Sequence, residues 1–362
     1  MTTVSVCTGN LYEKMKRSPI WICLTVLTIL CCTYFLRRKQ RKQSILLMSR
    51  YRGGSSFIGN IFNQNRDLLY YFEPLAVYGH GDDEHIDQKV QFLKQTFYGT
   101  VPSYSNAPDA AELETSEDIV QQCKKNGICM WQLSTRFCQP PFCNLTWAPA
   151  DHCGLACPHL NSPARLQQVQ TEMDATAGTV VKTVRIHDVE KLSPLLSDPN
   201  LDLKILVLVR DPRAVFASRV EIGKRIARTS NYTFYPENYL QTLAVECNQT
   251  ATSYQWTQQS KFQNKIKFIK FEDGLEKLEM LRDEIYNFIE MRYDPTSQFE
   301  LELEQKPNQY QKSVGGAYLS HQNDRDPAEV LESWRKKIDA EHISRIATDC
   351  KEILEIFEYS VK

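Results

Sequence analysis

A glycine-rich turn carries the first residues that could do chemistry. It follows the apolar run Ile45–Met48 and reads Arg52-Gly53-Gly54-Ser55-Ser56-Phe57. The glycines let the backbone turn sharply and expose its N–H groups, while the serines add hydroxyl donors where a helix begins. A helix N-terminus favours an anion by roughly 0.3–1 kcal/mol. The turn therefore predicts an anion site with Arg52 as its fixed charge; a plain turn between a strand and a helix is the alternative.

A second set of polar residues follows the apolar run Leu203–Val209. Arg210 comes directly after this run, Pro212 suits the first turn of the following helix, and Ser218 lies two helical turns further on. Because parallel strands end at one edge of a sheet, we expect Arg210 and Ser218 to hold a second anion near the first turn. Two such sites predict a ligand with two anionic ends. The first turn lacks the Gly-Lys pair with which nucleoside triphosphatases hold the Mg²⁺-bound phosphates of ATP.

Strands that alternate with helices are predicted along the chain, and this order predicts an α/β fold with a central parallel sheet flanked by helices. After the first run, we expect strands at residues 68–72, 179–184, 203–209 and 266–271. Helices are expected from Phe57 onward and at residues 80–97, 189–196, 212–226, 236–259 and 275–291. Residues 328–359 are expected to form two helices, broken near Asp339.

Charge and cysteine content narrow the class of protein. A net charge of −1 over 362 residues provides no basic field for nucleic acid. Sequons at Asn144, Asn231 and Asn248, together with the high cysteine content, favour the oxidising lumen of the secretory pathway. Eight of the 12 cysteines lie after the N-terminal segment: Cys123, Cys129, Cys138, Cys143, Cys153, Cys157, Cys247 and Cys350. Disulfides are expected among these eight with the pairing left open; zinc is the alternative, but a pair of C-x₂-C hooks is missing.

The N-terminal segment is expected to anchor the chain in a membrane. Residues 19–36 carry no charge and would form a helix of about 27 Å, close to the thickness of a thin bilayer. A cleaved signal peptide is the alternative, but no cleavage site of small residues follows. We expect residues 1–18 in the cytoplasm, a short stem at 37–44 and a lumenal domain at 45–362. The basic residues 37–42 conflict with this orientation under the positive-inside rule.

The two anion motifs resemble those of the Golgi carbohydrate sulfotransferases. The first turn, with Phe62-Asn63-Gln64-Asn65 and Phe72-Glu73-Pro74-Leu75, is similar to their 5′-phosphosulfate loop. The segment Leu208–Arg219 is similar to their 3′-phosphate site, and the similarity continues through residues 181–185, 271–273 and 333–335. It is strongest to the branch that sulfates the 6-hydroxyl of galactose, N-acetylgalactosamine or N-acetylglucosamine in keratan- or chondroitin-type chains.

This resemblance implies a P-loop-like sulfotransferase fold with an N-terminal transmembrane anchor, in a single-pass type II protein of the Golgi membrane. It implies 3′-phosphoadenosine-5′-phosphosulfate as donor, no metal, and a glycan or proteoglycan acceptor. The Cys-rich insertion at residues 99–160 would be a variable segment that binds the acceptor or a cross-linked surface lobe. The sequence does not determine the oligomeric state, and a homodimer is one alternative.

Roles for single residues follow from the same resemblance. Arg52 would be the catalytic cation, and Glu73 would be the general base that takes the proton of the acceptor hydroxyl. An ion pair of Glu73 with Lys182 or Arg185 is the alternative, and His80 and His187 are other candidate bases. The cofactor-binding residues would be Arg52, Gly53, Gly54, Ser55, Ser56, Phe57, Arg210, Ser218, Trp334 and Arg335.

The sequence also departs from the family pattern. Ala76-Val77-Tyr78 stands where a tryptophan commonly follows the Glu-Pro-Leu segment, which leaves the acceptor sugar open. Arg213 is expected to pair with an acid instead of a phosphate.

An inactive relative that binds a glycan or nucleotide is the alternative function. A nucleotide kinase is a third, but it would need a Mg²⁺ site and a lysine in the first turn.

Overall fold

The computed structural model describes residues 42–78, 85–100, 136, 163–229, 233–294 and 327–359. The chain divides into two units, residues 1–42 and 43–362, and the fold described below belongs to the second. In these described ranges no helix is long and apolar enough to cross a membrane. The predicted span at residues 19–36 lies outside them, as does nearly all of the insertion predicted at 99–160.

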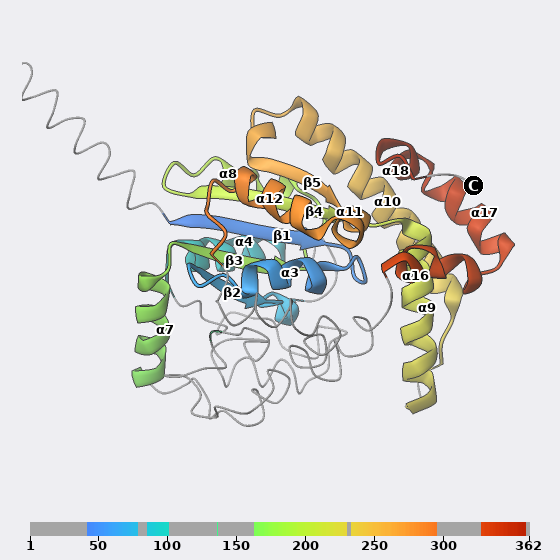
Figure 1. Ribbon diagram of the computed structural model, residues 1–362, viewed down its shortest axis with the longest axis horizontal. Helices are drawn as coiled ribbons and strands as arrows, with labels where there is room; N and C mark the ends of the chain where they lie inside the picture. Colours follow the sequence, from blue (N-terminus) through green and yellow to red (C-terminus); the bar gives the residue numbers. More distant parts are fainter. Residues whose placement is uncertain are drawn as a thin grey trace, which may run out of the picture. The chain divides into compact units, whose positions relative to one another are not determined.

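A five-stranded sheet forms the centre of the second unit, and every strand pair in it is parallel (Figure 1). The predicted central parallel sheet is therefore confirmed. Its strands are β1 (Gln43–Ser49), β2 (Leu68–Phe72), β3 (Gly178–Thr183), β4 (Asp202–Val209) and β5 (Ile266–Lys270), in the order β2-β3-β1-β4-β5. All seven residues of the central strand β1 are buried, as expected for a strand covered on both faces.

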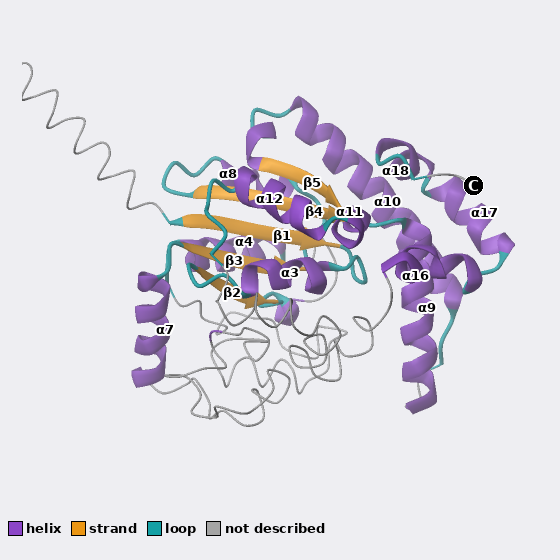
Figure 2. Ribbon diagram, in the orientation of Figure 1, coloured by secondary structure: helices purple, strands orange, loops and turns teal. Residues whose placement is uncertain are grey.

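Side chains alternate between two hydrophobic cores, one on each face of the sheet. Leu46 and Met48 of β1 point into one core, and Ile45 and Leu47 point into the other. The second core is covered by α3 (Ser55–Asn63), α11 (Phe271–Glu276) and α12 (Leu278–Phe288) (Figure 2). The first core is covered by α4 (Ile86–Phe97), α7 (Pro163–Ala175), η5 (Glu190–Leu192), α8 (Ser193–Leu196), α9 (Pro212–Thr229), α10 (Pro236–Gln259), α17 (Ala340–Asp349) and α18 (Lys351–Ile356).

Several predicted helices differ from those observed. The single helix expected at 275–291 is two helices, because the backbone of Lys277 leaves the helical region (φ −145°, ψ 64°) and redirects the chain. This turn places Leu281 and Ile285 in the second core. Instead of one helix, residues 190–196 form the 3₁₀ turn η5 followed by α8, and α7 was not predicted.

The C-terminal region contains more segments than the two predicted helices. These segments are α16 (Pro327–Glu332), η7 (Ser333–Lys336), α17 and α18. The break expected near Asp339 is confirmed, because its side chain caps α17 by accepting a hydrogen bond from the backbone N–H of His342 at 2.9 Å.

The parallel strands bring the predicted site segments to one edge of the sheet. β1 ends before Arg50, β2 before Glu73, β3 before Val184 and β4 before Arg210. Because all four strands run in the same direction, the residues that follow them meet at the carboxyl edge, where ligands bind in open α/β sheets.

Candidate active site

The loop between β1 and α3 (Arg50–Gly54) has a tightly constrained backbone. Arg52 and Gly54 both have a positive φ, 69° and 89°, and the N–H of Gly53 donates to the carbonyl of Arg50 at 2.8 Å. A Cβ on Gly54 would lie 2.2 Å from the ring of Phe271, so both conformation and space require glycine there. Helix α3 then begins at Ser55 and presents its free N–H groups at the carboxyl edge.

Arg52, Arg210 and Ser218 form one hydrogen-bonded cluster across this edge. The Nε of Arg52 donates to the Ser218 hydroxyl at 3.1 Å, and a terminal nitrogen of Arg210 donates to the Arg52 carbonyl at 3.0 Å. The loop after β1 and the segment after β4 therefore meet, although 158 residues separate Arg52 from Arg210. The structure thus brings together the two predicted anion motifs.

Arg210 is held on an aromatic ring and retains an unused donor. Its guanidinium lies 4.5 Å from the ring centroid of Phe271, in a cation–π contact. Its Nε is buried and has no hydrogen-bond partner among the described residues. Burial lowers the pKa of Arg210, while the nearby Glu272 carboxylate favours its charged form. A buried, unsatisfied guanidinium donor is an unusual feature that an anionic ligand would satisfy.

Glu272 links the Arg210 segment to the end of the chain. One carboxylate oxygen of Glu272 accepts from the backbone N–H of Asp211 at 3.1 Å, and the other accepts from the Tyr359 hydroxyl at 2.9 Å. Burial raises the pKa of Glu272, and these hydrogen bonds oppose that rise. The motif at 271–273 therefore positions the segment after β4, because Phe271 packs against the Arg210 guanidinium and Glu272 accepts from the Asp211 N–H.

Arg213 pairs with an acid, as predicted. Its Nε and a terminal nitrogen contact the Asp211 carboxylate at 2.7–3.2 Å, and its guanidinium lies 4.3 Å from the ring centroid of Trp334. Trp334 is itself buried in a small core with Ala214 and Ala217 of α9. The predicted nucleotide residue Trp334 is therefore placed where it supports the start of α9, and Arg335 is exposed and paired with Glu332.

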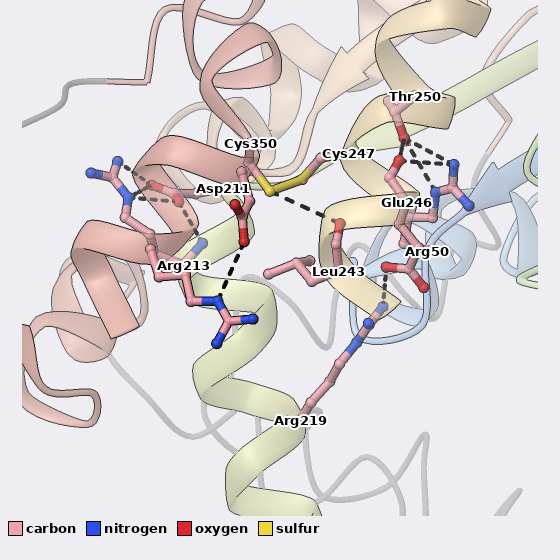
Figure 3. Close-up of a disulfide and its surroundings, with 11 residues drawn as sticks. Arg50, Asp211, Arg213, Arg219, Leu243, Glu246, Cys247, Thr250 and Cys350 are labelled. Carbon is pink, nitrogen blue, oxygen red and sulfur yellow. Dashed lines mark hydrogen bonds and ion pairs between the residues drawn. A yellow bond between two sulfur atoms is a disulfide. The ribbon is translucent and has the colours of Figure 1, made fainter. Parts of the chain in front are cut away.

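Side chains of helix α10 hold the loop between β1 and α3 in place (Figure 3). Arg50 donates to the Thr250 hydroxyl, to Gln249 and to the carbonyl of Glu246 at 3.0–3.2 Å. Buried Arg219 pairs with the Glu246 carboxylate at 2.7 Å and donates twice to the carbonyl of Tyr51. The backbone on both sides of Tyr51 is thus tied to a rigid helix. Arg50 and Arg210 also line a cavity of about 40 Å³, room for a few ordered waters.

A disulfide fastens α10 to the C-terminal helices. Cys247, one residue after Glu246, is bonded to Cys350 between α17 and α18, and the two are 103 residues apart (Figure 3). The expected use of cysteines in disulfides is observed for this pair; the six cysteines at 123–157 lie outside the described residues.

Removing this disulfide is expected to destabilise the protein. For a loop of this length, a double variant Cys247→Ala/Cys350→Ala should lose about 2–5 kcal/mol of unfolding free energy, measured by urea denaturation under non-reducing conditions. Lys351→Ala, a change at an exposed neighbouring position, is the control and should unfold close to the wild-type midpoint. An unchanged midpoint in the double variant would contradict a structural role for the bond.

Glu73 lies at the same edge, directly after β2, with a positive φ of 48°. Its carboxylate pairs with Lys182 at 2.5 Å, lies 3.8 Å from Arg185 and accepts from the Val184 N–H at 3.2 Å. The alternative for Glu73, an ion pair with Lys182 or Arg185, is therefore present in the structure. Burial lowers the pKa of Lys182, and Glu73 opposes that shift. The Glu73 carboxylate is buried and is held in one orientation by these contacts.

The other predicted site residues are only partly described. Asn248 is exposed on α10, whereas Asn144, Asn231 and His80 lie outside the described residues. His187 shares a hydrogen bond with the Val184 carbonyl at 2.9 Å. Within the described ranges no group of three metal-ligating side chains occurs.

Sequence reasoning missed the residues that hold the loops: Arg50, Arg219, Glu246 and Glu272. One signal was available, since Glu246 and Thr250 are four residues apart on the α10 face that carries Leu243 and Cys247. A charged residue on an apolar helix face indicates a buried ion pair. Its partner, 27 residues earlier on another helix, could not be identified from spacing.

Comparison with known proteins identifies the family of this chain. A family model described as the sulfotransferase domain matches residues 42–358. The chain is 32% identical over 211 residues to mouse carbohydrate sulfotransferase 7, covering 53% of this chain and 41% of that protein. It is 24% identical over 345 residues to mouse carbohydrate sulfotransferase 4, and the match covers 88% of this chain and 82% of that protein.

A solved mouse sulfotransferase complexed with PAP aligns with 89% of this chain and 87% of its own, at a TM-score of 0.42 and 9% identity. The match to carbohydrate sulfotransferase 7 spans about two fifths of that protein's length. The family model, in contrast, spans nearly all of the chain from β1 to Glu358. The predicted family is therefore confirmed: this chain belongs to the sulfotransferase family, and its curated relatives are carbohydrate sulfotransferases.

Proposed function

We propose that this protein transfers the sulfuryl group of 3′-phosphoadenosine-5′-phosphosulfate to the 6-hydroxyl of a glycan sugar. The acceptor would be galactose, N-acetylgalactosamine or N-acetylglucosamine of a keratan- or chondroitin-type chain. One observation supports this proposal above the others: Arg52, Arg210 and Ser218 form a single cluster at the carboxyl edge, in a chain of the sulfotransferase family.

The residues present suit a donor with two anionic ends. The positive φ of Gly54 forms the tight turn into α3, whose first backbone N–H groups suit a phosphosulfate anion. Arg210 contributes a buried Nε whose hydrogen bond no described residue accepts, which suits a phosphate oxygen. Ser218 contributes a hydroxyl that already accepts a hydrogen bond from Arg52.

Each residue would then have a separate task. The bound donor supplies an electrophilic sulfur and a phosphate leaving group. Arg52 and the backbone N–H groups of Gly54, Ser55 and Ser56 stabilise the negative charge that develops on the leaving oxygen. The Phe57 N–H already donates to the Gly54 carbonyl at 3.0 Å. Arg210 and Ser218 bind the 3′-phosphate and fix its position. Glu73, oriented by Lys182 and Arg185, accepts the proton of the acceptor hydroxyl.

The Arg210→Ala variant is expected to lose donor affinity. Hydrogen bonds to charged groups contribute about 1.5–3 kcal/mol, so the Kd for the nucleotide product, adenosine 3′,5′-bisphosphate, should rise roughly 10- to 150-fold. Calorimetric titration with that nucleotide measures it. Arg228→Ala, on an exposed position of the same helix as Ser218, should leave the Kd unchanged. Equal affinity in the Arg210 variant and the wild type would contradict the assignment.

Sulfate transfer from labelled donor to chondroitin, keratan and N-acetylglucosamine-terminated acceptors, catalysed by the full chain, tests the proposal directly. Transfer to one of them would support the activity and identify the acceptor. Nucleotide binding without transfer to any acceptor would favour the inactive relative. Failure to bind the nucleotide would overturn the proposal.

We propose a lumenal, type II orientation in the Golgi membrane for the same protein. The Cys247–Cys350 bond supports an oxidising compartment, since disulfides rarely persist in the cytosol. Glycosidase treatment of the expressed chain tests this, because glycans at Asn144, Asn231 or Asn248 form only in the lumen. A chain whose mobility is unchanged by the glycosidase would count against this orientation.

A further inference from the structure

Tyr51 is the exposed aromatic residue of the loop that carries Arg52. Its side chain is 38% exposed. An aromatic ring that stays accessible beside a candidate active site offers an apolar face and a polar tip to a ligand.

The backbone of Tyr51 is held rigidly although its ring is exposed. Both the Nε and a terminal nitrogen of Arg219 donate to the Tyr51 carbonyl, at 3.1 and 2.9 Å. Arg219 is itself buried and paired with Glu246. The ring therefore projects from a fixed point, as a preorganised contact surface requires.

Cationic groups of the site surround the ring. The guanidinium carbons of Arg52 and Arg219 lie 6.0 and 5.9 Å from its centroid. The phenol is also close enough to Arg185 to oppose the fall in the Arg185 pKa that burial causes. Arg185 in turn lies 3.8 Å from the Glu73 carboxylate, so Tyr51 is close to the candidate cation Arg52 and interacts with a neighbour of the candidate base Glu73.

No exposed aromatic side chain comparable to Tyr51 is found in the described segment directly after Glu73. Ala76, Val77 and Tyr78 form a 3₁₀ turn whose three side chains are buried in the first core. Elsewhere among the described residues, the exposed tyrosines are Tyr98 on the C-terminal side of α4 and Tyr235 before α10. Neither belongs to the loops at the carboxyl edge.

We propose that Tyr51 is the platform on which the acceptor sugar stacks, and hence a residue that determines acceptor affinity and specificity. This inference rests on the proposed function. The apolar face of a pyranose packs on the ring, and the phenol and Arg185 provide polar contacts at its rim. Tyrosine and arginine are the residue types that contribute most at binding surfaces, because one end is apolar and the other hydrogen-bonds.

Steady-state kinetics test the assignment. The full chain is assayed with varied concentrations of the acceptor that the transfer assay identifies. Tyr51→Leu should raise the acceptor KM about tenfold, whereas Tyr51→Phe, which keeps the ring, should stay within about threefold of the wild type. Tyr235→Leu is the matched control, an exposed tyrosine away from the loop, and should behave as the wild type. The Kd for adenosine 3′,5′-bisphosphate should change less than about twofold in all three.

The outcomes separate this inference from the proposed function. Transfer by the wild type with an unchanged acceptor KM in Tyr51→Leu overturns the inference alone. A parallel loss of nucleotide and acceptor affinity also overturns it, since Tyr51 would then only support the loop. If the wild type binds the nucleotide without transfer, the proposed function fails. Calorimetric titration of the same glycans into the nucleotide-loaded chain then tests the platform. A weaker glycan affinity in Tyr51→Leu than in the wild type supports it. Equal affinity in the two proteins, or no glycan binding to the wild type, overturns it.

Discussion

Replacing Arg52 by alanine is expected to lower the rate of sulfate transfer by about 10²–10³-fold, the usual effect of removing one preorganised donor to a developing negative charge. The guanidinium is fixed by its bond to Ser218 and by the loop backbone. It therefore needs no reorganisation when charge appears on the leaving oxygen. The loss should appear in kcat, measured with saturating donor and acceptor.

The backbone should tolerate this change. Arg52 already has a positive φ, and alanine meets the same backbone cost there as arginine, so the variant should fold. Arg52→Lys keeps the charge but cannot copy the fixed fork of the guanidinium, and an intermediate rate is expected. A rate within about threefold of the wild type in Arg52→Ala, with the nucleotide still bound, would exclude Arg52 as the catalytic cation.

Glu73→Gln is expected to lower kcat by about 10²–10⁴-fold, because an amide cannot accept the proton of the acceptor hydroxyl. The substitution is nearly isosteric, and the Val184 N–H retains an oxygen acceptor. Nucleotide affinity should stay near that of the wild type, since Glu73 contacts Lys182, Arg185 and the Val184 N–H and none of the three belongs to the Arg52–Arg210–Ser218 cluster. Single-turnover transfer with bound donor measures the chemical step directly.

A purely structural Glu73 would give a different pattern. Removing one partner of a buried ion pair costs about 3–5 kcal/mol, because Lys182 is left uncompensated. The double variant Glu73→Gln/Lys182→Gln removes both charges and should recover much of the stability. If the recovered protein regains transfer, Glu73 acts only through the ion pair, and His187 or another group is the base. If it is stable and still inactive, the base assignment stands.

Local sequence predicted the elements that carry the site. Apolar runs with turn residues at their ends placed the strands that begin at Leu68, Asp202 and Ile266 to within a residue or two. The glycine pair after the first run predicted a tight loop, and Gly54 indeed has the left-handed conformation. These features depend on neighbours in the chain, through backbone sterics and the burial period of a strand, so a linear pattern determines them.

Local patterns did not predict the breaks within the later helices. The segment 275–291 has a continuous helical pattern, yet the chain turns at Lys277 so that Leu281 can pack beside Gly274. That turn is favoured by contacts with Ile58 on α3, more than 200 residues away in the chain. Propensity alone could not locate it, because tertiary packing outweighs the few tenths of a kcal/mol at each residue.

The sequence by itself determined which residues could bind two anions: Arg52, Arg210 and Ser218 were all identified from the motifs that follow the first and fourth strands. Only the tertiary structure decided how they are held. The pairing of Arg219 with Glu246, the support of Asp211 by Glu272, the Cys247–Cys350 bond and the exposure of Tyr51 all join segments distant in the chain. A charge or a thiol is visible in a sequence, but its partner is selected by the packing of helices on the sheet, which brings together groups that no spacing rule relates.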